Sequence, residues 1–181
     1  MDSLVSTAWL AEHLHEDDLI VLDASKHLPA TGRDAGNEFL AAHIPGARFL
    51  NLADFADSAS SVGKTLPGPM HAAARFGALG LAAGSRVVLY DDSEIRTSAR
   101  AWFILRGYGF DQVAILDGGL AKWRAEGRPL ARGKAGVRKG RFSPVDFRGQ
   151  VRAKAQMLAN IASGDEQVVD ARDAARFEGA S

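Results

Sequence analysis

Short runs of apolar residues alternate along the chain with longer stretches in which apolar residues recur every three or four positions. The runs are apolar at consecutive positions and rich in β-branched side chains, which is typical of strands buried on both faces of a parallel sheet. We predict strands over Leu19–Asp23, Phe49–Leu52, Val87–Tyr90, Gln112–Leu116 and Gln167–Asp170.

The stretches between these runs predict helices, several with clear end signals. Ser6 is a suitable N-cap, Pro69 suits a first helical position, and Gly80, Gly127 and Gly164 suit helix ends. We predict helices after Ser6, from Leu120 to Gly127, and over Glu38–Ala42, Pro69–Leu79, Ser98–Gly107 and Val151–Ile161. The alternation indicates an α/β fold, an open, mostly parallel sheet with helices on both faces.

The loop that begins at Asp91 joins a predicted buried strand to a predicted helix. Functional sites of parallel α/β proteins lie beyond the carboxyl ends of the strands. Backbone N–H groups at the start of the Ser98–Gly107 helix would also favour an anion there. This loop is therefore the first candidate for a site.

Composition narrows the chemistry. The 181 residues include no cysteine, which excludes disulfides, zinc–thiolate sites and thiol nucleophiles within this chain. The formal net charge is zero, so nothing favours nucleic acid or an anionic membrane as a partner. No apolar run is long enough to span a bilayer, and Met1 to Ser3 lack the features of a signal peptide. We expect a cytoplasmic protein with no nucleic-acid or membrane partner.

The later part of the chain differs from the first 130 residues. Residues 131–152 carry seven basic residues and one acidic residue. This pattern fits either a basic arm that binds an anion or nucleic acid, or a solvated linker, and the scarcity of aromatic residues favours the linker. The segment Gln167–Arg172 then repeats the pattern of Ile20–Ser25, a strand that ends in Asp-Ala, which suggests a duplicated domain. About fifteen residues cannot bury a core, so we expect the chain to be a fragment of a longer one.

Three motifs resemble those of the rhodanese family. Phe39 to Leu50 reads Phe-Leu-Ala-Ala-His-Ile-Pro-Gly-Ala-Arg-Phe-Leu and is similar to the first family signature, with an aromatic residue before His-Ile-Pro-Gly-Ala. Leu116 to Trp123 resembles the second signature, and Val169 to Arg172 resembles the opening of a second rhodanese domain. The order looks like that of tandem thiosulfate/3-mercaptopyruvate sulfurtransferases. The resemblance implies a first, catalytically degenerate rhodanese domain over residues 1–130, a basic linker and helix over 131–164, and the start of a second domain over 165–181.

The resemblance also implies a reaction. Tandem sulfurtransferases move sulfane sulfur from thiosulfate or 3-mercaptopyruvate to cyanide or a thiol through a cysteine persulfide, without a metal or organic cofactor. Asp91 stands where active rhodanese domains place that cysteine, and a carboxylate cannot carry a transferable sulfur. We therefore expect no catalytic residue in this chain and a catalytic cysteine in a missing second domain, which is the partner of the first.

One residue receives a role by resemblance. An arginine four residues after the arginine of the Val-Asp-Ser/Ala-Arg motif reaches the anionic donor in the tandem family, and Arg176 matches it. Animal-type mercaptopyruvate enzymes carry an Asp and a His in the first domain where this chain has Ala53 and Lys64. The choice between thiosulfate and 3-mercaptopyruvate therefore stays open.

Other interpretations remain. The chain fits a non-catalytic rhodanese module that acts as a binding or regulatory domain. Asp91 and Asp92 fit a Mg²⁺-dependent phosphoryl acceptor, although other parts of such a site are not evident, and the histidine spacing predicts no metal site. Arg96 and Arg100 could either hold an anion near the loop or pair with these carboxylates. The remaining polar and aromatic candidates are predicted to be structural: His43 bonded to backbone, Trp102 and Trp123 in the core.

Overall fold

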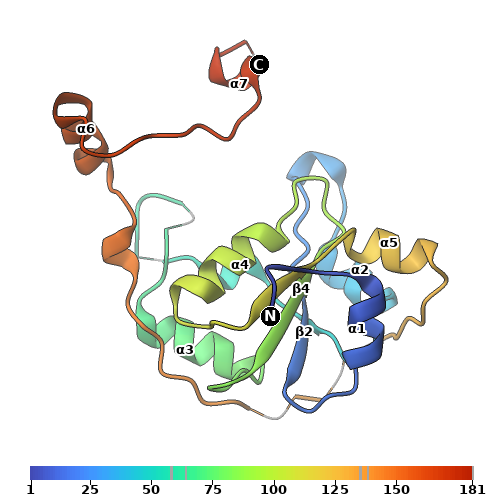
Figure 1. The fold of residues 1–181 in the computed structure, drawn as a ribbon. Coiled ribbons are helices and arrows are strands. Elements are labelled where there is room, and N and C mark those ends of the chain that lie inside the picture. Colours follow the sequence, from blue (N-terminus) through green and yellow to red (C-terminus); the bar gives the residue numbers. More distant parts are fainter. Residues whose placement is uncertain (58, 64, 135, 138, 181) are drawn as a thin grey trace. The chain divides into compact units, whose positions relative to one another are not determined.

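A computed structural model describes residues 1–57, 59–63, 65–134, 136–137 and 139–180. It divides into two compact units, Met1–Phe147 and Arg148–Ser181. The first unit contains a five-stranded parallel sheet in the order β1-β5-β4-β2-β3 (Figure 1). The strands are β1 (Leu4–Val5), β2 (Leu19–Asp23), β3 (Arg48–Phe49), β4 (Arg86–Tyr90) and β5 (Val113–Leu116).

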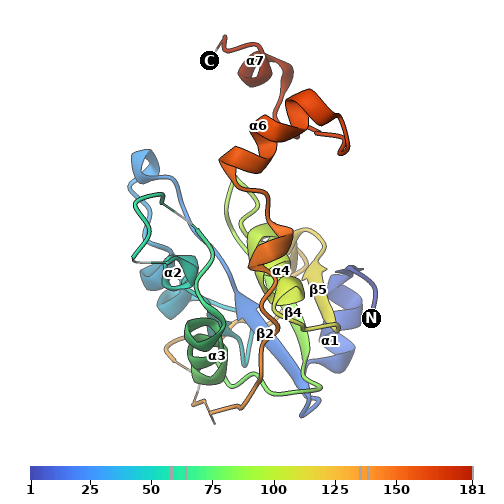
Figure 2. The same cartoon turned by 90° about the vertical axis from the view of Figure 1, so that its left-hand side faces the viewer.

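Helices cover both faces of the sheet, as predicted. They are α1 (Thr7–His13), α2 (Ala35–Ala41), α3 (Pro69–Ala78), α4 (Ser98–Gly107) and α5 (Gly119–Ala125). Side chains of α3 and α4 share one core with Leu22 and Leu89, whereas those of α1, α2 and α5 share a second core with Val21 and Val88. Figures 1 and 2 show α4 beside β4 in both views. The alternation of β2 and β4 between two cores explains why their sequences are apolar at every position.

Several predicted bounds are confirmed by local hydrogen bonds. Ser6 caps α1, where its hydroxyl accepts the N–H of Trp9 at 3.1 Å. Pro69 is the first residue of α3, and Gly80 follows its end with a φ of 78°. The helix predicted over Ser98–Gly107 is α4 without change. Ser6 and Pro69 are thus local sequence signals that correctly predict where α1 and α3 begin.

Two predicted strands are wrong in part or in full. Phe49–Leu52 contributes only Phe49 to β3, because the Asn51 side chain accepts the N–H of Ala53 and starts a 3-10 turn, Leu52–Phe55. Gln167–Asp170 forms no strand, and Val169 is 86% exposed. Strands need a neighbour for their backbone hydrogen bonds, and the described residues of the second unit form only helices: α6 (Lys154–Ser163), α7 (Ala174–Phe177) and the 3-10 turn Arg148–Gln150.

The segment predicted as a solvated linker packs in part against the first unit. Ala131 forms a bridge with His43, and the N–H of Gly140 bonds to the carbonyl of Gly77 at 3.0 Å. Phe142 stacks on Phe110 with ring centroids 3.8 Å apart. The first compact unit thus extends past the boundary predicted at residue 130, because the few aromatic side chains of the basic segment complete a core. The assignment of residues 165–181 to a second domain stays a prediction.

Phe147 closes one of the two cores. Its side chain is 4% exposed and meets Tyr108 edge to face at 4.9 Å, and it covers Gly107, where a β-carbon would collide with its ring. We expect Phe147→Ala to lower the free energy of unfolding by about 3–5 kcal/mol, measured by urea denaturation. The matched variant Phe177→Ala removes a ring that is 66% exposed and should change it by less than about 0.5 kcal/mol. Equal effects would contradict the role of Phe147 in the core.

Candidate functional site

The carboxyl ends of β2 and β4 lie side by side, because Asp23 is in register with Tyr90. The chain leaves β4 at Asp91 and passes through a loop to α4. This arrangement brings the loop beside the segment that follows β2. The loop predicted as the first candidate for a site thus lies at the carboxyl edge of the sheet, between β4 and α4.

The Asp91 side chain is buried and bonded to backbone. One carboxylate oxygen accepts the N–H of Ser93 at 3.0 Å, and the other accepts the N–H of Ser98, the first residue of α4, at 2.7 Å. Negative charge at a helix N-terminus is favourable, so Asp91 stabilises the loop and the start of α4. Its backbone carbonyl accepts the N–H of Leu120, and a β-carbon at Gly119 would collide with that oxygen. Glycine is thus required at position 119, because the backbone there comes close to the carbonyl oxygen of Asp91.

Hydroxyl groups tie the loop to the segment after β2. Ser93 and Thr97 hydroxyls lie 2.8 Å apart, and the Thr97 hydroxyl donates to the carbonyl of Ala24 at 2.7 Å. In return, the N–H of Lys26 donates to the Ser93 hydroxyl, and the N–H of Asp92 donates to the Ser25 hydroxyl, both at 2.9 Å. These bonds hold the loop in one conformation.

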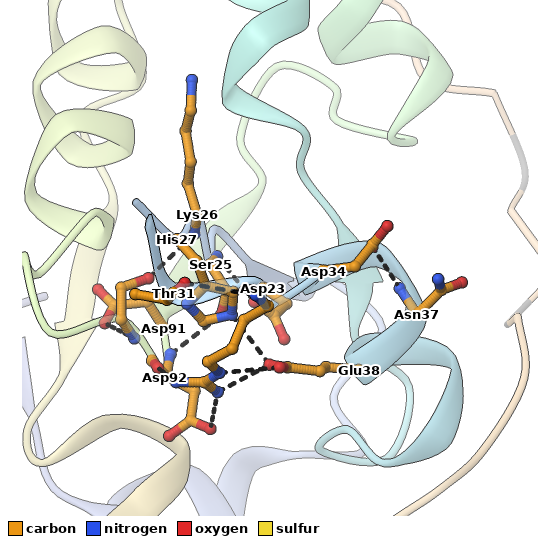
Figure 3. A network of polar contacts seen from close by, with 12 residues as sticks. Asp23, Ser25, Lys26, His27, Thr31, Asp34, Asn37, Glu38, Asp91 and Asp92 are labelled. Carbon is orange, nitrogen blue, oxygen red and sulfur yellow. Dashed lines mark hydrogen bonds and ion pairs between the residues drawn. The ribbon is translucent and has the colours of Figure 1, made fainter. Parts of the chain in front are cut away.

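The Asp92 carboxylate joins a chain of ion pairs (Figure 3). Arg33 and Arg124 each reach it at 3.2 Å, and Arg33 also forms two bonds with Glu38 at 2.7 and 2.8 Å. The hydrogen bonds that Arg33 donates to Glu38 lower the pKa of Glu38 and raise the pKa of Arg33. The His27 Nε2 atom lies 2.9 Å from Glu38 Oε2, the oxygen that also accepts the shorter of the two Arg33 bonds. Figure 3 shows the Lys26 side chain pointing away from these carboxylates.

Sequence reasoning missed Arg33 and Arg124 as partners of Asp92. It considered Arg96 and Arg100, which are close to Asp92 in sequence. Arg124 lies on the helix after β5, and the rule that parallel strands share one functional edge could have identified it. Arg96 adopts a left-handed conformation with a φ of 52°, which is uncommon for residues with a β-carbon.

The structural prediction for His43 is confirmed. The ring is 2% exposed, its Nδ1 lies 2.7 Å from the carbonyl of Phe39, and it stacks on the Phe39 ring. Trp123 is fully buried in the core, and Trp102 is half-buried with its indole N–H bonded to Val113. Ala53 lies in the 3-10 turn after β3, and Lys64 lies outside the described residues.

Arg176 belongs to the second unit, on the short helix α7. Its side chain is 66% exposed and its Nε lies 3.4 Å from the Asp173 carboxylate. Arg176 and Asp91 are thus described in separate units, and the donor-binding role of Arg176 stays a prediction.

The arrangement around Asp91 limits its chemistry. Both of its carboxylate oxygens accept backbone N–H groups, and Asp92 is held by two guanidinium groups. Within the described ranges, no group of three or more His, Asp or Glu side chains is placed to hold a metal ion. No helix among the described residues has the length and hydropathy to cross a membrane. The carboxylates of Asp91 and Asp92 are thus already bonded to groups of the chain itself.

Comparison with known proteins identifies the family to which this chain belongs. The family model of the rhodanese-like domain matches residues 6–126, more than half of the chain. This chain belongs to the rhodanese family. The rhodanese chain is 38% identical over 183 residues to the 3-mercaptopyruvate sulfurtransferase of Mus musculus, and 36% identical over 183 residues to the thiosulfate sulfurtransferase of Gallus gallus. Each alignment covers 98% of this chain, which spans 62% and 63% of those two proteins.

Solved structures agree. An Escherichia coli structure that addresses the rhodanese fold and catalytic mechanism of 3-mercaptopyruvate sulfotransferases is 31% identical, with a TM-score of 0.89 over 98% of this chain and 68% of the other. The Tum1 protein of Saccharomyces cerevisiae is 21% identical with a TM-score of 0.81, a likeness of fold alone. The predicted rhodanese resemblance and fold class are thus confirmed.

A second carboxylate, that of Asp23, is buried beside the loop. Asp23 is 2% exposed, and burial, together with the nearby Asp91 charge, raises its pKa above the ordinary 3.8, although bonds from Ser25 and Tyr90 oppose this rise. A raised native pKa means that the folded state favours protonated Asp23. The resulting stability is present below about pH 4 and is lost as the pH rises through the native pKa.

We expect Asp23→Asn to remove this dependence, because the amide oxygen still accepts the Ser25 N–H and carries no charge. The free energy of unfolding of the wild type, relative to this variant, should fall as the pH rises above about 4 and through the native pKa of Asp23, measured by urea denaturation at several pH values. Asp18→Asn is the control with the opposite sign, because the Arg86 hydrogen bond lowers the pKa of Asp18. A difference between wild type and Asp23→Asn that is independent of pH would contradict the prediction.

Proposed function

We propose that this chain is the first part of a tandem-domain sulfurtransferase, with its persulfide-forming cysteine in a second rhodanese domain. The observation that carries the proposal is the likeness of 98% of this cysteine-free chain to a mercaptopyruvate sulfurtransferase that is longer than it. The sulfur donor is thiosulfate or 3-mercaptopyruvate, and the acceptor is cyanide or a thiol.

The chemistry explains why the cysteine is needed. A thiolate attacks the outer sulfur of thiosulfate, the sulfur–sulfur bond of the donor breaks, and sulfite leaves with the bonding electron pair. The enzyme then holds a persulfide, which an acceptor thiolate or cyanide attacks in turn. A carboxylate at position 91 offers no equivalent, because its oxygens cannot form and release such a bond, and both accept backbone N–H groups.

The first domain then has a structural role. Asp91 caps α4 in place of a reactive group, and the ion pairs of Asp92 with Arg33 and Arg124 connect the loop after β4 to the loop after β2 and to helix α5. A loop held by these bonds suits a structural role in the first domain rather than a catalytic one. The repeat of the Val-Asp-Ala-Arg pattern at Val169 supports the presence of a second, similar domain.

A second candidate is a non-catalytic rhodanese module for binding or regulation. The Asp91 loop favours this candidate, because both carboxylate oxygens of Asp91 are bonded to backbone N–H groups and need no catalytic residue beside them. A longer parent chain with a cysteine in the corresponding loop of a second copy would favour the sulfurtransferase. A parent chain without that cysteine would favour the module.

The chain by itself should show no sulfur transfer. With thiosulfate and cyanide, thiocyanate formation should equal that of a heat-denatured sample, because no thiolate is present. Mass spectrometry after incubation with thiosulfate should show no added sulfur atom. Thiocyanate formation that rises in proportion to the concentration of pure chain would contradict the proposal.

In the longer parent protein, Arg176→Ala should weaken donor binding by roughly 1.5–3 kcal/mol, because it removes a charge-assisted hydrogen bond. Arg176→Lys should restore part of the loss, since it keeps the charge without the planar fork. The effect should appear as slower persulfide formation at low donor concentration, measured by stopped flow.

Transfer from a preformed persulfide to cyanide should be affected less, because the donor remnant has already left. Arg152→Ala is the matched control, as Arg152 is an exposed arginine of the same unit that pairs with Glu166. Equal damage to both half-reactions, or an equal effect of Arg152→Ala, would mean that Arg176 does not contact the donor.

A further inference from the structure

An open cavity of about 410 Å³ lies along the edge strand β3. Its lining comes from α2, β3, the residue after α3 and the basic segment, and it includes no residue of the Asp91–Thr97 loop. Figure 3 shows Asp34 and Asn37, two residues of its rim, well apart from Asp91 and Asp92. The cavity is thus separate from the loop described above, and its volume is within the range of small-molecule sites.

The walls are mostly apolar. Phe39 and Phe49 lie with their ring centroids 5.6 Å apart, and Leu79 closes the end next to α3. Leu40 and Val137 line the cavity and are both 38% exposed, although large apolar side chains usually turn inward. Such walls suit a flat or branched apolar group.

Arg48 brings a cation into this apolar space. Its guanidinium donates one hydrogen bond to the carbonyl of Leu79 at 2.5 Å, and burial lowers the pKa of Arg48. A guanidinium has five N–H donors, so most of its capacity is not used by that bond. Among the described residues, no carboxylate lies within ion-pair distance of it, in contrast to the paired Arg33 and Arg86.

Two further charged groups line the cavity. Lys134 adds a second cation, and its ammonium has no ion pair within the described part of the chain. Among the described residues of the lining, Asp34 is the only acid, and its carboxylate accepts the N–H of Asn37 as the N-cap of α2. The local balance is therefore positive, on apolar walls, in a protein whose formal net charge is zero.

We propose that this cavity binds a small organic anion with an apolar body, of the class of aromatic carboxylates. The carboxylate would take the free N–H donors of Arg48 and lie near Lys134, and the ring would lie against Phe49 and Leu79. Arginine suits this role because its planar fork matches the two oxygens of a carboxylate. The proposal does not depend on sulfur transfer, and the chain alone suffices to test it.

The test is a titration of the isotope-labelled chain with 2-naphthoate, followed by amide NMR. Saturable shifts should concentrate on Gly36, Phe49 and Leu79. The neutral analogue 2-naphthalenemethanol has the same ring without the charge, and it should bind at least about tenfold more weakly. Equal affinity for both compounds would mean that apolar contact alone accounts for binding, and it would overturn the proposal. The absence of saturation up to about 10 mM would also overturn it.

Variants locate the anion. Arg48→Met should weaken 2-naphthoate binding by about tenfold, and Lys134→Met, at an exposed position where folding is not at risk, by about threefold. Arg132→Met removes the same charge outside the lining and should leave the affinity within about twofold. If Arg48→Met does not fold, Arg48→Lys replaces it, with partial loss expected. Shifts centred on Ser98 and Gly118, or equal effects of Arg132→Met and Lys134→Met, would overturn the proposal.

Discussion

The parallel pairing of β2 with β4 is the constraint on which the rest of this structure depends. Five residue pairs run in register from Leu19 with Arg86 to Asp23 with Tyr90. Both strands are covered by helices on both faces, so a slip by one residue would exchange the two cores. The same register brings the ends of the two strands together, and it thereby places the loop that begins at Asp91 beside the segment that follows β2.

At that edge of the sheet the Asp91 carboxylate is hydrogen-bonded to backbone N–H groups. A loop that follows a parallel strand and precedes a helix presents N–H groups to whatever charge lies inside it. Here the charge comes from the chain itself, as Asp91, and the neighbouring Asp92 pairs with Arg33 from the loop after β2 and with Arg124 from helix α5. Backbone and side-chain donors are satisfied within the fold, so the loop holds its shape without a ligand.

Sequence patterns predicted the central strands, α4 and the caps at Ser6 and Pro69, because burial on both faces and capping chemistry are local signals. They failed where the outcome depends on distant partners. The strand at Gln167–Asp170 has the right composition but no neighbouring strand among the described residues, and Asn51 turns the chain after β3 through a bond to Ala53. The partners of Asp92, Arg33 and Arg124, are distant from it in the sequence and meet it only through the shared edge of the sheet, so proximity along the chain does not predict them. The sequence around Arg48 does not predict a binding site, because the cavity that Arg48 lines forms only when four segments pack together.

The contribution of Phe142 and Phe147 to the core has a consequence for synthesis on the ribosome. All five strands have been made by residue 116, yet the core that contains Phe76 and Tyr108 is completed by side chains made up to thirty-one residues later. During that interval the nascent chain exposes an aromatic surface, the kind of surface that chaperones bind and that promotes aggregation.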